Sequence, residues 1–458
     1  MSDVKQILST NLLYNQHKER WTFLYRSFVG GQDYKNAGYL TKYQLETQAE
    51  YKARCDSTPL DNQCKSVISV YNSFLFREDP SREFSNLTNL AELQDFLFDA
   101  DLEGRSFNNF MKEVATWSNV FGHSWVIVSK PNINAVTRAD EVAIGVRPYV
   151  SLLTPLTVTD WQWKRDAAGR YTLVYLKYIE DVNGDVQTIK EWTPELINTY
   201  TVDVAHDVLN DCTTEDNQLG IIPAVIAYSD RSITRGIGVS QIDDIADCQR
   251  YIYNALSEAE QSIRLDSHPS LVTTADTQVG VGAGAIINMA ENLDPGLKPY
   301  VLDFAGANID NIYTVISNTI SSIEKMASIG GVRATESRSM SGVAMETEFQ
   351  LLNAKLSSLA DNMELAEEQI WEIFALYQGT QWNGEIHYPG SFNIRDTGTE
   401  IKNLQIAKAT ATDPALLAEI DEQLAEALGI ENFESTIPSV GETNGQQDTE
   451  TVDVDEMN

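Results

Sequence analysis

Helical spacing of apolar residues predicts three helices in the first quarter of the chain, over residues 3–28, 37–77 and 90–119. The first helix should end at Gly30 and the second before Pro80, because glycine and proline both interrupt a helix. The chain therefore opens with a helical region of about 120 residues.

The pattern changes to that of strands at Gly122 and keeps it to about residue 228. Val, Ile, Thr, Tyr and Trp are frequent there, and the turn sequences DAAGR and DVNGD divide the segment into hairpins. The second turn is similar to the start of a calcium loop, but the twelfth position is Trp192 rather than glutamate. We therefore predict a hairpin turn.

Two further helices are predicted over residues 239–265 and 308–329, the second with isoleucines along one stripe. They would span roughly 40 and 33 Å at about 1.5 Å per residue. The segment between them has short apolar runs and a glycine cluster, which favour short strands. We expect an antiparallel helix pair with a small module at its tip.

The longest predicted helix covers residues 342–378, where apolar residues recur at alternating steps of three and four. We interpret it as a core helix that packs against its own chain. An extended piece should follow Trp382, and then a helical segment over 399–428. The last eighteen residues, 441–458, have six acidic groups and no basic one, which predicts a disordered tail.

Composition adds a strong acidic bias. The 458 residues include 33 basic and 67 acidic ones, a net charge of −34. This charge disfavours a large surface that binds nucleic acid or membrane by neutralising phosphates. It is compatible with a protein through which a polyanion passes without being tightly bound. The sequence has no run of 18 apolar residues and no signal-peptide core at its start, so we expect no membrane association.

Motifs for catalysis are weak. The run VGVGAGA (279–285) lacks the lysine and spacing of a nucleotide-binding loop, and the five histidines lie far apart. The cysteines have no metal-ligand spacing and are predicted to be reduced thiols: Cys55, Cys64, Cys212 and Cys248. We predict no catalytic residue, no metal and no cofactor, and that the chain is not an enzyme. An acidic enzyme whose groups meet only in the fold stays open as an alternative.

Five stretches are distinctive in their order and spacing. Residues 26–54 carry a double glycine, a tyrosine, a Tyr-Leu pair and then spaced Glu, Tyr and Arg, and Asn62 precedes VISVYNSFLFRE. LGIIPAV (219–225) is followed by GIGVSQIDDIADCQRYIYNALSEAEQSI and HPSL, and SGVAMETEFQ stands at 341–350. Together these stretches resemble the portal proteins, or head-to-tail connectors, of tailed bacteriophages, over roughly residues 20–380.

The resemblance implies an α+β fold with the parts of a portal subunit. These would be a wing (1–238), a first stem helix (239–265), a clip (266–307), a second stem helix (308–329), a tunnel loop (330–341), a long wing helix with its return (342–394), a helical crown (395–440) and the acidic tail (441–458).

The resemblance also implies a function. Portals of this kind form dodecameric rings at one capsid vertex and are the channel for DNA packaging and ejection. The implied partners are further copies of the chain, the terminase large subunit, head-tail adaptor proteins, the major capsid and scaffolding proteins, and double-stranded DNA passing without sequence specificity. The chain would be assembled in the host cytoplasm and reside in the virion. Another ring-forming virion protein, an adaptor or minor capsid component, is the alternative.

Candidate site residues follow from that architecture. Arg333 and Arg338 against Glu336 give the tunnel loop a small positive excess in an acidic chain. The expected DNA-facing residues are Arg333, Ser337, Arg338 and Ser339, with Gly330, Gly331 and Gly342 as hinges. The expected channel-lining residues are Asn311, Thr314, Asn318, Ser321 and Lys325.

Overall fold

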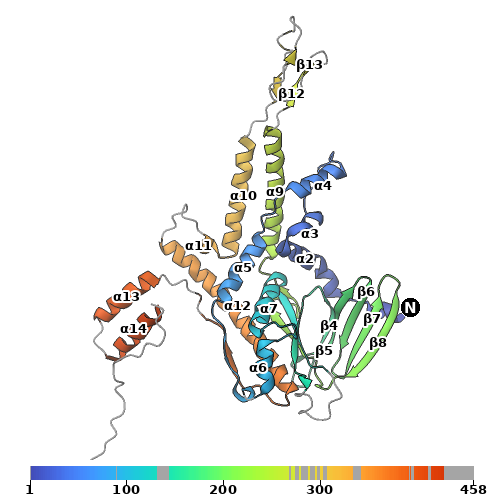
Figure 1. Ribbon diagram of the computed structural model, residues 1–458, viewed down its shortest axis with the longest axis vertical. Helices are drawn as coiled ribbons and strands as arrows, with labels where there is room; N and C mark the ends of the chain where they lie inside the picture. Colours follow the sequence, from blue (N-terminus) through green and yellow to red (C-terminus); the bar gives the residue numbers. More distant parts are fainter. Residues whose placement is uncertain are drawn as a thin grey trace, which may run out of the picture. The chain divides into compact units, whose positions relative to one another are not determined.

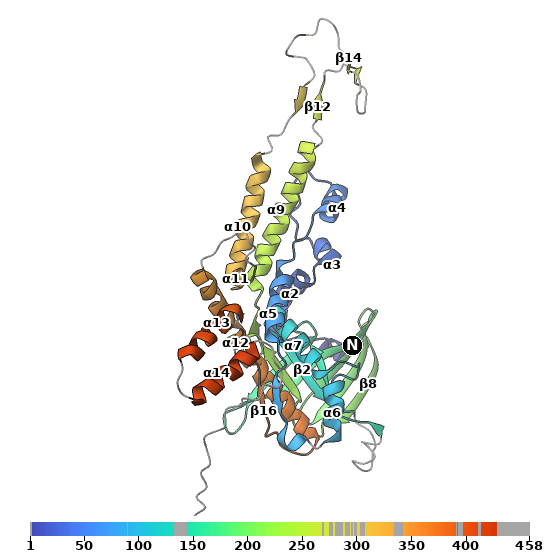
Figure 2. The same ribbon diagram turned by 60° about the vertical axis from the view of Figure 1, so that its left-hand side comes forward.

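The computed structural model describes residues 2–88, 90–131, 144–267, 270–273, 278–279, 287–288, 294, 296, 300–302, 307–333, 342–390, 392, 397–410 and 414–427. It is an α+β protein, 50% helical and 22% strand, as the sequence predicts. The chain divides into two compact units, 1–392 and 393–458. Figures 1 and 2 show the arrangement of the elements. In the described part of the chain, no helix has the length and apolar character needed to cross a membrane.

The N-terminal region has more and shorter helices than predicted. They are α1 (Ser2–Ile7), α2 (Leu12–Val29), α3 (Gly31–Asn36), α4 (Gln48–Ser57) and α5 (Gln63–Leu75). The prediction of continuous helices over 3–28 and 37–77 is wrong because capping side chains begin new helices within those ranges. Asn11 and Asn62 accept backbone N–H groups at the starts of α2 and α5, and Thr47 forms a capping box with Glu50 at α4.

The predicted helix over 90–119 is also two helices, α6 (Ala91–Phe98) and α7 (Phe107–Phe121). The carboxylate of Asp99 accepts the backbone N–H of Gly104 at 2.7 Å, and that of Asp101 accepts the N–H of Glu103 at 3.0 Å. These bonds satisfy backbone groups outside a helix, so the turn competes with helix continuation. Ser106 then caps α7.

Strands follow α7, as predicted, and form two main antiparallel sheets. A three-stranded sheet has the order β3–β2–β9, and a five-stranded sheet has the order β4–β5–β6–β7–β8. Their bounds are β2 (His123–Ser129), β3 (Tyr149–Leu153), β4 (Val158–Arg165), β5 (Tyr171–Asn183), β6 (Val186–Trp192), β7 (Leu196–Asp203), β8 (Val208–Asp216) and β9 (Ala224–Tyr228). Both predicted turns join paired strands, and Gly184 has the positive φ (61°) that a tight hairpin needs.

Gly122 and Gly238 allow two backbone segments to cross closely. Gly122 ends α7 at φ 92°, and a Cβ atom on Gly238 would lie 2.0 Å from the Gly122 oxygen. Gly238 belongs to β11 (Gly238–Val239), which pairs with β10 (Asp230–Arg231). This contact fixes where the chain leaves the sheet and enters the next helix, α9.

The predicted helix pair is present as α9 (Asp243–Ser267) and α10 (Ala307–Met326). Both views show the two helices side by side, with the short strands between them in sequence lying beyond their far ends (Figures 1 and 2). Strand β12 (Ser270–Val272) pairs with β15 (Tyr300–Leu302), and β13 (Gln278–Val279) with β14 (Ile287–Asn288). Most other residues of 266–307 lie outside the described ranges.

Helix α12 (Gly342–Tyr377) is the long helix that the apolar spacing predicts, and its stripe is buried from Leu352 to Ile373. It contacts β2, β9 and α5. A pairing that the sequence does not indicate joins β1 (Ser81–Glu83) to β16 (Glu385–His387). There, Arg82 forms a buried ion pair with Glu367 of α12.

The second unit contains α13 (Thr397–Thr410) and α14 (Pro414–Ala427) in its described part. The sequence predicts one helical segment over 399–428, and the structure has two helices there. Lys408 of α13 pairs with Asp421 of α14. The tail, residues 441–458, lies outside the described residues.

Candidate functional site: the helix pair and its supporting arm

The helix pair, α9 and α10, is joined by one apolar stripe on each helix. On α10, Ile316 and Ile323 are buried, and Ile312 and Ile320 are half-buried. The predicted isoleucine stripe is therefore the packed face of this helix. Of the rest of α10, most described side chains are exposed.

The five residues expected to line a channel lie on the side of α10 opposite the isoleucine stripe, at helical spacing. Four of them are exposed, and Ser321 is half-buried. Thr314 donates its hydroxyl to the Asp310 carbonyl at 2.8 Å, and the Asn318 carbonyl accepts from Ser322 at 3.0 Å. The structure thus brings Asn311, Thr314, Asn318, Ser321 and Lys325 together on one polar face.

Apolar side chains are exposed on both flanks of that polar face. Tyr313 is 45% exposed on one flank, and Val315 and Met326 are 40% and 42% exposed on the other. These side chains give α10 apolar surface on both flanks of its polar face.

The helix pair is acidic. Its two helices contain eight Asp or Glu residues against Arg250, Arg264 and Lys325. Two of these cations are already paired, since Arg250 contacts Asp247 at 3.0 Å and Arg264 contacts Glu260 at 2.9 Å. The pair offers little attraction to a phosphate backbone.

The predicted tunnel loop begins differently from the expectation. Gly330–Arg333 forms a short helix, α11, rather than the start of a loop. Gly330 lies against α12, where a Cβ atom would come within 2.3 Å of a carboxylate oxygen of Glu348. Gly331 is also within α11, and Gly342 is the first residue of α12. Ser337, Arg338 and Ser339 lie outside the described residues, as does the side chain of Arg333.

A segment that sequence analysis did not mark as a site supports α9. This segment, residues 31–58, contains α3 and α4 and is called the arm below. Both views show it beside α9, on the side away from α10 (Figures 1 and 2). It carries most of the residues of the first stretch that resembles portals.

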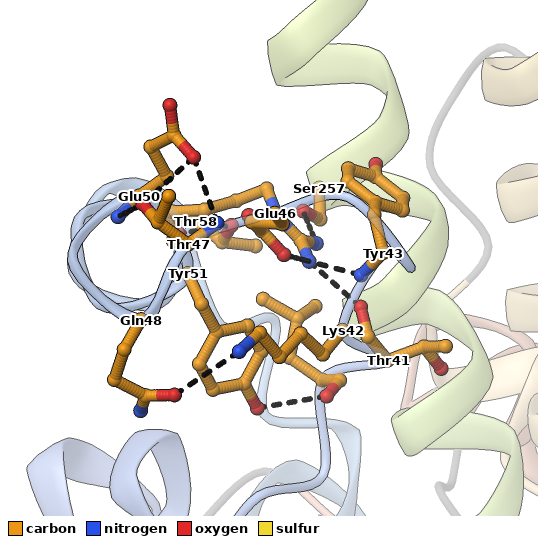
Figure 3. Close-up of polar contacts among 12 residues, drawn as sticks. Thr41, Lys42, Tyr43, Glu46, Thr47, Gln48, Glu50, Tyr51, Thr58 and Ser257 are labelled. Atoms are coloured by element: carbon orange, nitrogen blue, oxygen red, sulfur yellow. Dashed lines mark hydrogen bonds and ion pairs between the residues drawn. The ribbon is translucent and has the colours of Figure 1, made fainter.

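Arg54 is the centre of the arm, and Figure 3 shows the residues that it binds, Thr41, Glu46 and Ser257. Its guanidinium donates to both oxygens of Glu46 at 2.8 Å, to the Thr41 carbonyl at 2.7 Å and to the Ser257 hydroxyl of α9 at 2.9 Å. It also lies 4.0 Å from the ring centre of Tyr43. The hydrogen bond from Arg54 lowers the pKa of Glu46, and the same bond raises the pKa of Arg54. The arm and α9 thus share one charged cluster.

Three further contacts fasten the arm to α9. Tyr43 donates to Glu258 at 2.6 Å, and the Asn254 side chain joins the N–H of Thr41 and the carbonyl of Tyr39 at 2.8 and 3.0 Å. Proximity of Tyr43 to Glu258 and burial together raise the pKa of its hydroxyl to about 12, burial being the larger cause. These bonds connect segments about 210 residues apart in the chain.

Gly30, the residue before the arm, must be glycine. Its φ is 71°, and a Cβ atom there would lie 2.8 Å from the Asn62 side-chain nitrogen. That nitrogen donates to the Phe28 carbonyl at 3.0 Å, while the Asn62 oxygen caps α5. The first glycine of the double glycine and Asn62, both part of the resemblance, are therefore in direct contact.

Polar contacts hold the base of α9, and those of Gln249 are buried. Gln249 is fully buried, donates to the Ser27 carbonyl of α2 and accepts the Cys64 N–H of α5, both at 2.9 Å. Arg20 binds Asp243 and Asp247 at 2.8 Å. Sequence reasoning missed Gln249, although its position in phase with Ile245 and Ile252 is a signal for a buried polar group.

The cysteines are free, as predicted, and burial raises the pKa of the Cys64 thiol. Within the described ranges, no cluster of three or more His, Cys, Asp and Glu side chains is arranged to hold a metal ion.

No protein-family model matches the chain, and no curated protein matches it. Among solved structures, similar chains come from gene transfer agent (GTA) particles. One is described as "Virion of native gene transfer agent (GTA) particle"; its TM-score is 0.45 at 11% identity, and the match covers 87% of this chain and 98% of that chain. A second, "Neck of empty GTA particle computed with C6 symmetry", has a TM-score of 0.45 at 12% identity and covers 86% of this chain and 99% of that chain. A third, "Neck of native GTA particle computed with C12 symmetry", has a TM-score of 0.42 at 11% identity and covers 79% of this chain and 89% of that chain. Similarity at this level assigns no function.

Proposed function

We propose that this chain is the subunit of a portal ring, the channel through which double-stranded DNA enters and leaves a phage-like particle. Its role is structural rather than catalytic. The α9–α10 pair is the stem, residues 266–307 are the clip and residues 330–341 the tunnel loop. The arm and the two main sheets belong to the wing, and α13 and α14 to the crown.

The observation that carries the proposal is the order of elements around the helix pair. Two antiparallel helices enclose a short-strand segment, and the second is followed by a short connection and the longest helix, α12. The sequence stretches that resemble portals lie at the matching positions. Two of them, the arm and α9, are also in direct contact through Arg54 and Ser257.

The surface of α10 supports the same assignment. A stem helix in a ring needs one face for its own partner helix, one face toward the channel and two flanks for neighbouring subunits. On α10 these correspond to the isoleucine stripe, the polar face, and the exposed Tyr313 on one flank with Val315 and Met326 on the other.

Charge supports a channel that does not retain DNA. Each neutralised phosphate adds to affinity, so a pore lined with many cations would slow a moving duplex. The stem helices carry eight acidic groups against three basic ones. In this proposal, twelve copies form the ring in the virion, and the terminase large subunit and then head-tail adaptors dock on the clip side. Scaffolding and major capsid proteins surround it at the vertex.

The direct test is the mass and shape of the purified chain. We expect closed rings with an axial channel in native mass measurement and negative-stain images. Monomers and dimers alone, at high protein concentration and over a range of salt, would contradict the proposal.

A matched pair of variants tests the assignment of α10. Val315→Asn with Met326→Asn alters an apolar flank and should reduce ring formation while circular dichroism stays unchanged. Thr314→Asn, on the polar face of the same helix, should leave rings intact. If both variants form rings equally well, the apolar flank of α10 is not part of the interface between subunits.

A further inference from the structure

A groove of about 510 Å³ opens between β9, the start of β5 and α12. Its floor is apolar, with Leu173, Val174, Ile222 and Ile226 among the lining residues. It lies in the β region, and its lining includes no residue of the helix pair, the arm or the predicted loop.

One wall of the groove is a free strand edge. Among the described strands, β9 pairs with β2 alone, in the sheet order β3–β2–β9. Val128 N–H donates to the Pro223 carbonyl and Ser229 N–H to the Gly122 carbonyl, both at 2.9 Å. In antiparallel pairing these bonds recur at every second residue. The main-chain groups of Ile226 and Tyr228 therefore point away from β2, and both residues line the groove.

The facing wall also has an unpaired edge. Strand β6 pairs with β5 only from Leu176 onward, so residues 171–175 of β5 are paired on the β4 side alone. Thr172, Leu173 and Val174 from this half-paired piece line the groove. An exposed strand edge of this kind is a template for an added strand.

The charge of the groove is opposite to that of the whole chain. Its charged lining residues within the described structure are Arg231 and Arg235, without an Asp or Glu among them. Both guanidiniums lie on aromatic rings, Arg235 at 3.8 Å from the Tyr171 ring centre and Arg231 at 5.2 Å from that of Tyr228. Neither has an ion-pair partner among the described residues, although acidic residues outnumber basic ones two to one in the sequence.

Trp163 adds an unused donor. It lines the groove, and its indole N–H is buried without a hydrogen-bond acceptor in the described part of the molecule. A buried donor without a partner costs free energy, so this indole is a polar group that the described part of the fold leaves unsatisfied beside the groove.

We propose that this groove binds an extended acidic segment of a partner protein, which adds to the edge of β9 as a further strand. The main chain of the segment pairs with Ile226 and Tyr228, and alternate apolar side chains fill the floor. One or two carboxylates contact Arg231 and Arg235, which follow β9 in the chain. Strand β9 offers about 17 Å of edge at roughly 3.3 Å per residue, enough for five residues of the partner. Charge complementarity selects an acidic segment.

The test uses the full chain and a fluorescent peptide of alternating valine and aspartate, with a valine–lysine peptide as the matched control. We expect the aspartate peptide to bind and the lysine peptide to bind at least tenfold more weakly. Arg231→Ala with Arg235→Ala should weaken aspartate-peptide binding about tenfold. Arg170→Ala, an exposed arginine outside the groove, should not change it.

Hydrogen exchange gives a second readout that does not depend on the arginines. Bound aspartate peptide should slow exchange at the amides of Ile226 and Tyr228, and change little at Val225 and Ala227, which already face β2. Binding that leaves the first two amides unprotected would overturn strand addition. Equal affinity of both peptides, or an unchanged affinity of the double alanine variant, would overturn the charge assignment.

Two other occupants are distinguished in the same experiment. If the peptide binds only to a chain ending at Val440, the protein's own acidic tail competes for the groove, and a partner protein is not its occupant. If the peptide instead lowers the oligomeric mass of the chain, the groove is filled by a second copy. Either result would overturn the proposal.

Discussion

Arg54 and Glu46 form a two-point ion pair, with both N–O distances at 2.8 Å and side chains only 4% and 7% exposed. The pair links the arm to α9 because the same guanidinium also reaches Ser257. Arg54 is thus one of several side chains that hold α9 against the N-terminal region, beside Asn254 and Gln249.

Arg54→Ala should lower the free energy of unfolding by about 3 kcal/mol, because it leaves Glu46 buried and unpaired. Arg26→Ala is the matched control, since Arg26 pairs with Asp33 at a more exposed site and should cost at most about 1 kcal/mol. Urea unfolding of both variants measures the difference. Equal losses would mean that the Arg54 cluster contributes no more than a surface ion pair.

The same pair predicts acid sensitivity. The folded pKa of Glu46 is lowered by Arg54, from an ordinary value of 4.5. Its contribution to stability is therefore complete above about pH 4.5 and is lost as pH falls through the lower folded pKa. Glu46→Gln should reduce the loss of stability in this range relative to the parent chain. If the free energy of unfolding falls equally with decreasing pH in both proteins, the Arg54–Glu46 pair is not the cause of the acid sensitivity.

His123 predicts a second pH effect with a different window. It is fully buried between the rings of Trp21 and Tyr228, and burial lowers its pKa to about 3 from 6.5. The unfolded chain takes up the proton first, so stability should fall below pH 6.5, by up to about 1.4 kcal/mol per pH unit. His123→Gln should flatten this dependence, whereas His206→Gln, at an exposed turn, should not. The free energy of unfolding between pH 7 and 5 measures both.

The helix pair should not fold alone. Gln249, Tyr253 and Ser257 of α9 are buried, and their side chains form hydrogen bonds with α2, α5 and the arm. A fragment of residues 239–329 loses these contacts and should show a non-cooperative thermal transition by circular dichroism. Residues 1–392, which form one compact unit, are the positive control. A stable, cooperative monomer of the fragment would refute this prediction.

The predicted loop residues are tested through the proposed function. Arg333→Ala with Arg338→Ala should leave ring assembly intact and reduce packaged DNA per particle, because each arginine contacts phosphate only briefly in a wet, screened channel. Deletion of residues 332–340 should have the larger effect, and Arg170→Ala should have none. Full packaging by both the double variant and the deletion would make the loop a passive connector.

Elements whose signals are local can be predicted from the amino-acid sequence. Apolar spacing identifies α9, α10 and α12 within a few residues, since a buried stripe at helical period can be satisfied only by a helix. The β region and its two turns are also predicted by local signals, namely strand-forming residues and turn sequences. The breaks at Thr47 and Asp99 were missed, although the capping and turn side chains that cause them are readable in the sequence.

Contacts between these elements become visible only in the folded chain. Arg54 is visible in the sequence as an isolated cation, but its contact with Ser257 depends on how the chain returns after about 200 residues. The free edge of β9 likewise depends on which strands pair, and the fold then places Arg231 and Arg235 in the groove beside it. The spacing of apolar residues indicates whether a segment is a helix or a strand. Which elements become its neighbours is set by contacts between distant parts of the chain, which burial of apolar surface stabilises against the entropy cost of closing long loops.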